Sequence, residues 1–83
     1  MFKINEVRIN KVNRGHLLGY ASILICDCFV IEGIELHEGK KGRYLLMPLN
    51  SKRRNVKRNC AYPITNETRE KILNVISDKY DEN

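Results

Sequence analysis

Arginine and lysine side chains that could bind phosphate are gathered in one stretch of this 83-residue chain. Of its 15 basic residues, eight lie between Glu38 and Glu67, where no Asp or Glu occurs. We call this stretch the basic window, and its cations are Lys40, Lys41, Arg43, Lys52, Arg53, Arg54, Lys57 and Arg58. Because the rest of the chain is more acidic than basic, the window more than accounts for the net charge of +5. Such an uneven charge attracts polyanions to one face, and nucleic acid is the commonest polyanion that fits.

Within the basic window, the arginines have the chemistry for the most specific contacts. A guanidinium binds a phosphate through two hydrogen bonds or pairs with the edge of a guanine, so Arg53 and Arg54 are our first candidates. The remaining cations of this segment suit contacts that follow the phosphate backbone, and they are Lys52, Lys57 and Arg58. Any sequence preference would therefore come from the arginines.

Two tyrosines flank the central part of the basic window and are candidates for stacking on bases. Tyr44 precedes it and Tyr62 follows it, and each ring could stack on an unpaired base of a single strand. The other interpretation places both tyrosines half-buried in strands, which is the commoner environment for this residue type. The sequence leaves both interpretations open.

The residue types that usually support catalysis or metal binding are sparse. His16 and His37 have no Cys or carboxylate at metal-ligand spacing, and the Cys26–Cys28 segment is too local to hold zinc without further ligands. Cys60 brings the cysteines to three, which suits reduced thiols better than a disulfide framework. Since no nucleophile, base and orienting group form a recognisable motif, we expect no enzyme, cofactor, metal or small-molecule substrate.

Length and composition predict one small domain over residues 1–83. A chain of this size buries only about 60% of its unfolded surface, so its core is thin and self-association would help it. No apolar run approaches the roughly 18 residues that cross a bilayer, and the N-terminus lacks the pattern of a signal peptide. We therefore expect a cytoplasmic protein without a membrane partner.

The order of apolar residues predicts an α+β fold, an antiparallel sheet of about five strands over residues 2–64 followed by one C-terminal helix over 66–80. Alternation around Val7 and Ile9 indicates a first strand, with a bulge or a late strand start near Asn5 because Phe2 and Ile4 have the opposite parity. Residues 17–26 are almost wholly apolar and predict a strand buried on both faces.

The later strands are shorter and follow turn residues. In the third strand, residues 29–36, we expect Val30, Ile34 and Leu36 on one face. The segment 39–42 has the composition of a hairpin turn, a fourth strand follows at 44–47 until proline ends it, and a short fifth strand is expected at 59–64.

The end of the chain has the pattern of an amphipathic helix. Thr65 or Asn66 is expected to cap its N-terminus. Its apolar residues recur at helical spacing and should pack on the sheet: Ile72, Val75, Ile76 and Tyr80.

Ten short segments spread over the chain follow a familiar order. They are Val7-Arg8, Val12-Asn13, Ala21-Ser22-Ile23, Phe29-Val30-Ile31, Gly33-Ile34, Met47-Pro48, Ser51-Lys52-Arg53, Ala61-Tyr62-Pro63-Ile64, Thr68-Arg69 and Lys71-Ile72. Through these segments nearly the whole chain resembles the stage V sporulation protein G (SpoVG) family of bacterial septation and sporulation regulators. The chain departs from the family pattern where Leu49-Asn50 separate the proline from the serine and basic residues, and where Tyr62 replaces a usual histidine.

The resemblance implies a homodimer that binds DNA, RNA or both and regulates gene expression linked to sporulation and septation. The dimer would form through an exposed sheet edge or through the second face of the buried strand. The alternative is a protein-interaction factor in cell division whose basic loop docks on an acidic protein partner.

Overall fold

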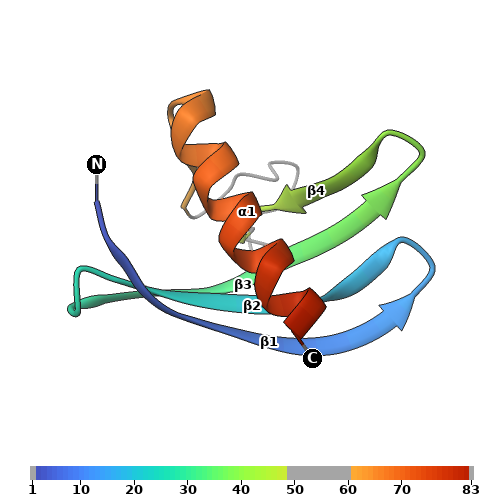
Figure 1. Ribbon diagram of the computed structural model, residues 1–83, viewed down its shortest axis with the longest axis horizontal. Helices are drawn as coiled ribbons and strands as arrows, with labels where there is room; N and C mark the ends of the chain where they lie inside the picture. Colours follow the sequence, from blue (N-terminus) through green and yellow to red (C-terminus); the bar gives the residue numbers. More distant parts are fainter. Residues whose placement is uncertain (1, 49–60, 83) are drawn as a thin grey trace, which may run out of the picture.

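The computed structural model describes residues 2–48 and 61–82, which fold into an antiparallel sheet with a helix across one face (Figure 1). The elements are β1 (Ile4–Arg14), β2 (Leu17–Ile25), β3 (Phe29–Gly39), β4 (Gly42–Leu46) and α1 (Asn66–Glu82). The strands pair in the order β1-β2-β3-β4. The predicted α+β class is thus confirmed, with four strands in the described residues rather than about five. Residues 61–64 of the expected fifth strand are not in a strand, and residues 59–60 lie outside the described part.

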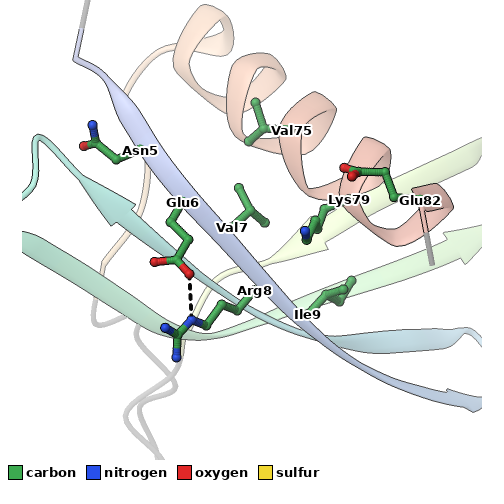
Figure 2. Close-up of a pocket in the computed structure, with 8 residues that line it drawn as sticks. All are labelled: Asn5, Glu6, Val7, Arg8, Ile9, Val75, Lys79 and Glu82. Carbon is green, nitrogen blue, oxygen red and sulfur yellow. Dashed lines mark hydrogen bonds and ion pairs between the residues drawn. The ribbon is translucent and has the colours of Figure 1, made fainter.

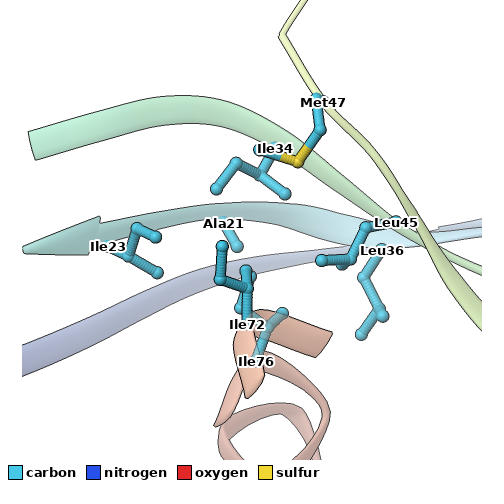
Figure 3. Packing of buried hydrophobic residues seen from close by; sticks show 8 residues of the cluster. All are labelled: Ala21, Ile23, Ile34, Leu36, Leu45, Met47, Ile72 and Ile76. Carbon is cyan, nitrogen blue, oxygen red and sulfur yellow. The ribbon is translucent and has the colours of Figure 1, made fainter. Parts of the chain in front are cut away.

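The core lies between one face of the sheet and α1 (Figure 3). Each strand from β2 to β4 presents alternate apolar residues to this face, and the helix supplies two isoleucines one turn apart. The buried residues are Ala21, Ile23, Ile34, Leu36, Leu45, Met47, Ile72 and Ile76. Because only this side of the sheet is covered by a helix in the described residues, the other side, which we call the open face, remains at the surface.

The prediction that β2 is buried on both faces is wrong for this chain on its own. Ala21 and Ile23 are 3% and 1% exposed beneath the helix, whereas Tyr20 on the open face is 44% exposed. Leu24, also on the open face, is half-buried. An apolar sequence alone does not distinguish a strand covered on both sides from one whose second face carries large exposed side chains.

Four register shifts interrupt the pairing of the described strands, and two of them bear on the sequence predictions. The pairing shifts between Ile4 and Glu6, so of the two alternatives expected near Asn5 the bulge is the one present, and the strand already starts at Ile4. A second bulge lies in β3, where Gly33 has a φ of +78°, a conformation that glycine adopts without strain. The extra residue reverses the alternation, so Val30 is 58% exposed and does not share the buried face of Ile34 as predicted.

The helix begins and ends where contacts fix it to the rest of the chain. Thr65 is the observed cap, because its Oγ1 accepts a hydrogen bond from the Thr68 backbone N–H at 3.1 Å. Near the start, Lys71 Nζ donates to the Phe2 carbonyl, and near the end the Tyr80 hydroxyl donates to Asn13 Oδ1 at 2.6 Å. Helix α1 therefore contacts the chain beside both ends of β1, and its C-terminus lies near the β1–β2 turn.

Candidate nucleic-acid interface

The β1–β2 and β3–β4 turns lie at the same end of the sheet (Figure 1). The two turns are joined there, since the Glu38 backbone N–H donates to the His16 carbonyl at 2.8 Å and His16 Nδ1 lies 2.9 Å from the Glu38 carbonyl oxygen. Three exposed cations lie on or beside these two turns, and they are Arg14, Lys40 and Lys41. We call the two turns with these cations the basic turns. The fold thus brings the first cations of the basic window to the same end of the sheet as an arginine that sequence analysis left out.

The other predicted phosphate-binding residues fall elsewhere in the chain. Lys52, Arg53, Arg54, Lys57 and Arg58 lie outside the described residues. Of the candidate residues in the first part of the basic window, the structure describes Lys40, Lys41, Arg43 and Tyr44.

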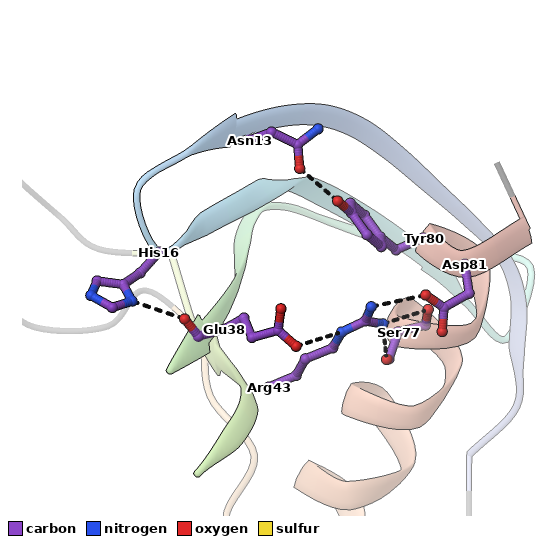
Figure 4. A network of polar contacts seen from close by, with 7 residues as sticks. All are labelled: Asn13, His16, Glu38, Arg43, Ser77, Tyr80 and Asp81. Carbon is purple, nitrogen blue, oxygen red and sulfur yellow. Dashed lines mark hydrogen bonds and ion pairs between the residues drawn. The ribbon is translucent and has the colours of Figure 1, made fainter. Parts of the chain in front are cut away.

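Arg43 differs from the neighbouring lysines because its guanidinium contacts α1 (Figure 4). Its Nη1 donates to Ser77 Oγ at 2.6 Å, and its Nη2 donates to Asp81 Oδ1 at 2.9 Å. Its Nε lies 3.7 Å from a carboxylate oxygen of Glu38 across the hairpin. The hydrogen bond to Asp81 raises the pKa of Arg43 above its ordinary value, so the group stays charged wherever the protein is folded.

The ring of Tyr80 completes this polar network. Lys11 Nζ lies 4.4 Å from the ring centroid and the Arg43 guanidinium carbon lies 5.0 Å from it, both within the range of cation–π attraction. Arg43 thus links β4 to the last turns of α1, a contact between residues 38 positions apart that a charge count along the sequence does not reveal.

The two candidate stacking tyrosines lie at different places in the fold. Tyr44 is 42% exposed on the open face next to the basic turns, and its ring stacks on His37 with centroids 5.3 Å apart and 18° between the planes. His37 is fixed in turn by Glu35, whose Oε1 lies 2.9 Å from His37 Nε2. Tyr62 is 61% exposed and precedes the N-terminus of α1, the end of the helix far from the basic turns.

The SpoVG family model matches residues 2–82 of this sequence. The chain belongs to the SpoVG family. It is similar to proteins named "Putative septation protein SpoVG" in three bacteria. Identity is 39% over 79 residues with the Phytoplasma australiense protein, covering 94% of this chain and 82% of that protein. It is 38% over 80 residues with the Treponema denticola protein, covering 95% and 86%, and 39% over 79 residues with the Agathobacter rectalis protein, covering 94% and 91%.

In this SpoVG-family fold a groove of about 520 Å³ lies between β1 and α1 (Figure 2). Apolar side chains of Val7, Ile9 and Val75 line it, with Lys79 and Glu82 from the helix. Strand β1 is at the edge of the sheet, so the groove runs beside a strand whose outer backbone is open to pairing within the described residues.

The described residues offer little for metal chemistry. Among them, no group of three or more His, Cys, Asp and Glu side chains is placed to hold a metal ion. Cys26 and Cys28 are exposed free thiols at the β2–β3 turn, at the opposite end of the sheet from the basic turns. No helix in residues 2–48 and 61–82 is long and apolar enough to cross a membrane.

Proposed function

We propose that this SpoVG-family chain binds nucleic acid, DNA or RNA, as a homodimer and regulates gene expression linked to septation and sporulation. The observation that carries the proposal is the joining of two hairpin turns through His16 and Glu38, which gathers Arg14, Lys40 and Lys41 at one end of the sheet. Cations held at one end of a sheet can neutralise several phosphates of one strand and release their counterions. The names of the relatives, septation proteins, support the link to septation.

The ion pairs among the described residues also support a binding surface at the basic turns. Glu38, the acidic residue nearest the basic turns in the chain, contacts Arg43, and Arg43 also contacts Asp81. In these contacts Glu38 and Asp81 bind Arg43 rather than the cations of the basic turns. Lys52, Arg53, Arg54, Lys57 and Arg58 remain binding residues in the proposal because of their charge and number.

The groove beside β1 supports a homodimer formed through this sheet edge. A second β1 could pair with the free backbone of the first, and its side chains would cover Val7, Ile9 and Val75. The core of a single chain is one thin layer, so the added burial would stabilise both subunits. A twofold dimer of this kind repeats the basic window and leaves both open faces accessible.

The binding proposal is tested by fluorescence-anisotropy titration of the full chain against labelled duplex DNA, single-stranded DNA and RNA of matched sequence. We expect salt-sensitive binding to at least one probe at physiological salt. Absence of binding to all three would contradict the proposal and favour the alternative in which the basic residues dock on an acidic protein.

The dimer is tested by sedimentation velocity on Val75→Glu, which places a charge in the groove, and on Asn74→Glu, which places the same charge at an exposed position of α1. We expect Val75→Glu to dissociate the dimer and Asn74→Glu to leave it intact. A Val75→Glu variant that is folded, as judged by circular dichroism, and still dimeric would contradict the edge-strand interface.

A further inference from the structure

The open face carries aromatic and apolar side chains that the core does not use. Tyr20, Tyr44 and Leu46 are 44%, 42% and 44% exposed there. Residues directly opposite on neighbouring strands point to the same face, so the register places these side chains in rows. The row nearest the basic turns is Tyr44, His37, Leu17 and Arg14, and the next row is Leu46, Glu35, Tyr20 and Asn10.

From this arrangement we propose that the open face binds single-stranded nucleic acid by stacking unpaired bases on Tyr44 and Tyr20. The inference rests on the proposed function and names its substrate as a single strand rather than a duplex. The phosphates would follow the basic turns, from Lys40 and Lys41 to Arg14, and the bases would extend from there over the sheet. Each ring can stack on any base, because every base has an aromatic face.

The ring of Tyr44 is held in a fixed position for this role. It stacks on His37, which is 14% exposed and lies 2.9 Å from Glu35 through its Nε2. A ring that is already oriented loses little side-chain entropy when a base packs against it. Lys40 and Lys41 adjoin it at the same hairpin, so phosphate contact and base stacking occur side by side.

Tyr20 borders a hollow that fits the second base. This hollow of about 300 Å³ lies on the open face between β1 and β3, where the small Ser22 and Gly33 leave room. Asn10 and Ser22 line it and offer both donors and acceptors to the polar edge of a base, while Arg8 offers donors and Glu32 offers acceptors. Tyr44 and Tyr20 are on strands two apart, about 10 Å across the sheet, so they serve different bases.

The charge of the face favours this orientation of the strand. Glu6 and Glu32 lie toward the β2–β3 end of the open face, where they would repel phosphates. Glu35 lies between the strands of Tyr20 and Tyr44, and its carboxylate is 2.9 Å from His37 Nε2. The basic turns lie at the other end, where they would attract them. A duplex keeps its bases stacked within itself and exposes only their edges in the grooves, so it offers no base face to Tyr20 or Tyr44.

The test compares the full chain with Tyr20→Leu/Tyr44→Leu, using a labelled single strand of about twelve nucleotides, the same strand with abasic sites, and its duplex. Phe29→Leu is the matched control, because Phe29 is 69% exposed but adjoins the β2–β3 turn at the other end of the sheet. We expect the double variant to bind the intact single strand about fivefold or more weakly. Its affinity for the duplex and the abasic strand should match that of the unmodified protein, and Phe29→Leu should match it throughout.

Unchanged affinity of the double variant for the single strand would overturn the inference while leaving the proposed function in place. Absence of binding to every probe would instead overturn the proposed function and the inference with it. If the double variant but not Phe29→Leu falls from dimer to monomer, the face holds a second copy and the inference is also overturned.

A measurement on the unmodified protein keeps the test independent of folding of the variant. A single strand carrying 5-iodouracil is photocross-linked to the protein, and the attachment site is mapped by mass spectrometry. Cross-links at Tyr20 or Tyr44 are expected. Cross-links at Tyr62 alone would overturn the inference.

Discussion

Arg43 Nη2 on β4 donates to Asp81 Oδ1 at 2.9 Å, which ties the last strand of the described sheet to the last turn of α1. The arginine belongs by sequence to the basic window, yet its side chain is only 23% exposed and reaches the helix rather than solvent. This contact separates Arg43 from Lys40 and Lys41, which are exposed at the adjoining turn.

We therefore expect Arg43→Ala to act mainly on stability. Loss of the bonds to Ser77 and Asp81 should lower the free energy of unfolding by about 1–2 kcal/mol, the lower part of the range for bonds to charged groups because Asp81 is 61% exposed. For a domain of this size the thermal midpoint would fall by about 5 °C or more, measured by circular dichroism. Lys41→Ala is the matched control and should leave the midpoint nearly unchanged. An unchanged midpoint for Arg43→Ala with a large loss of nucleic-acid affinity would show that its guanidinium binds phosphate instead.

The cap of α1 gives a second prediction about stability. Thr65→Ala removes the oxygen that accepts from the Thr68 N–H, and we expect a loss of about 1 kcal/mol in urea unfolding. Thr65→Asn should keep most of the stability because asparagine caps equally well. Equal stability of the alanine and asparagine variants would contradict the role of this hydrogen bond.

The sequence predicted those parts of the fold that depend on neighbouring residues. The Thr65 cap, the bulge near Asn5 and the hairpin turn with Lys40 and Lys41 follow from local chemistry. The exposure of Val30 does not, because it results from the bulge at Gly33 and from the register with β2.

The candidate site was predicted less completely, for similar reasons. Lys40, Lys41 and Tyr44 adjoin one another as residues of one hairpin. Arg14 and Tyr20 come from strands that only the tertiary pairing brings near them, and Tyr20 is hidden in the sequence within an apolar run. The role of Arg43 depends on a helix far along the chain, which residue type and charge do not indicate.

The arginines in the central part of the basic window, Arg53 and Arg54, are expected to act on binding rather than on folding. Arg53→Ala/Arg54→Ala should weaken nucleic-acid binding by about tenfold or more and leave the thermal midpoint nearly unchanged, since guanidinium contacts to phosphate or guanine are lost. Lys3→Ala/Arg69→Ala removes the same charge outside the window and serves as the control for net charge. If both double variants lose equal affinity, overall charge and not this segment governs binding.

The most direct test of phosphate binding at the basic turns is the dependence of single-strand affinity on salt, measured by anisotropy for the unmodified chain and for Lys40→Gln/Lys41→Gln. Each phosphate contact to a single strand contributes a slope of about −0.7 in log affinity against log salt. We predict that the variant has a slope shallower by about 1.4, with its thermal midpoint unchanged. Equal slopes for the two proteins, or an affinity that does not vary with salt, would contradict the account.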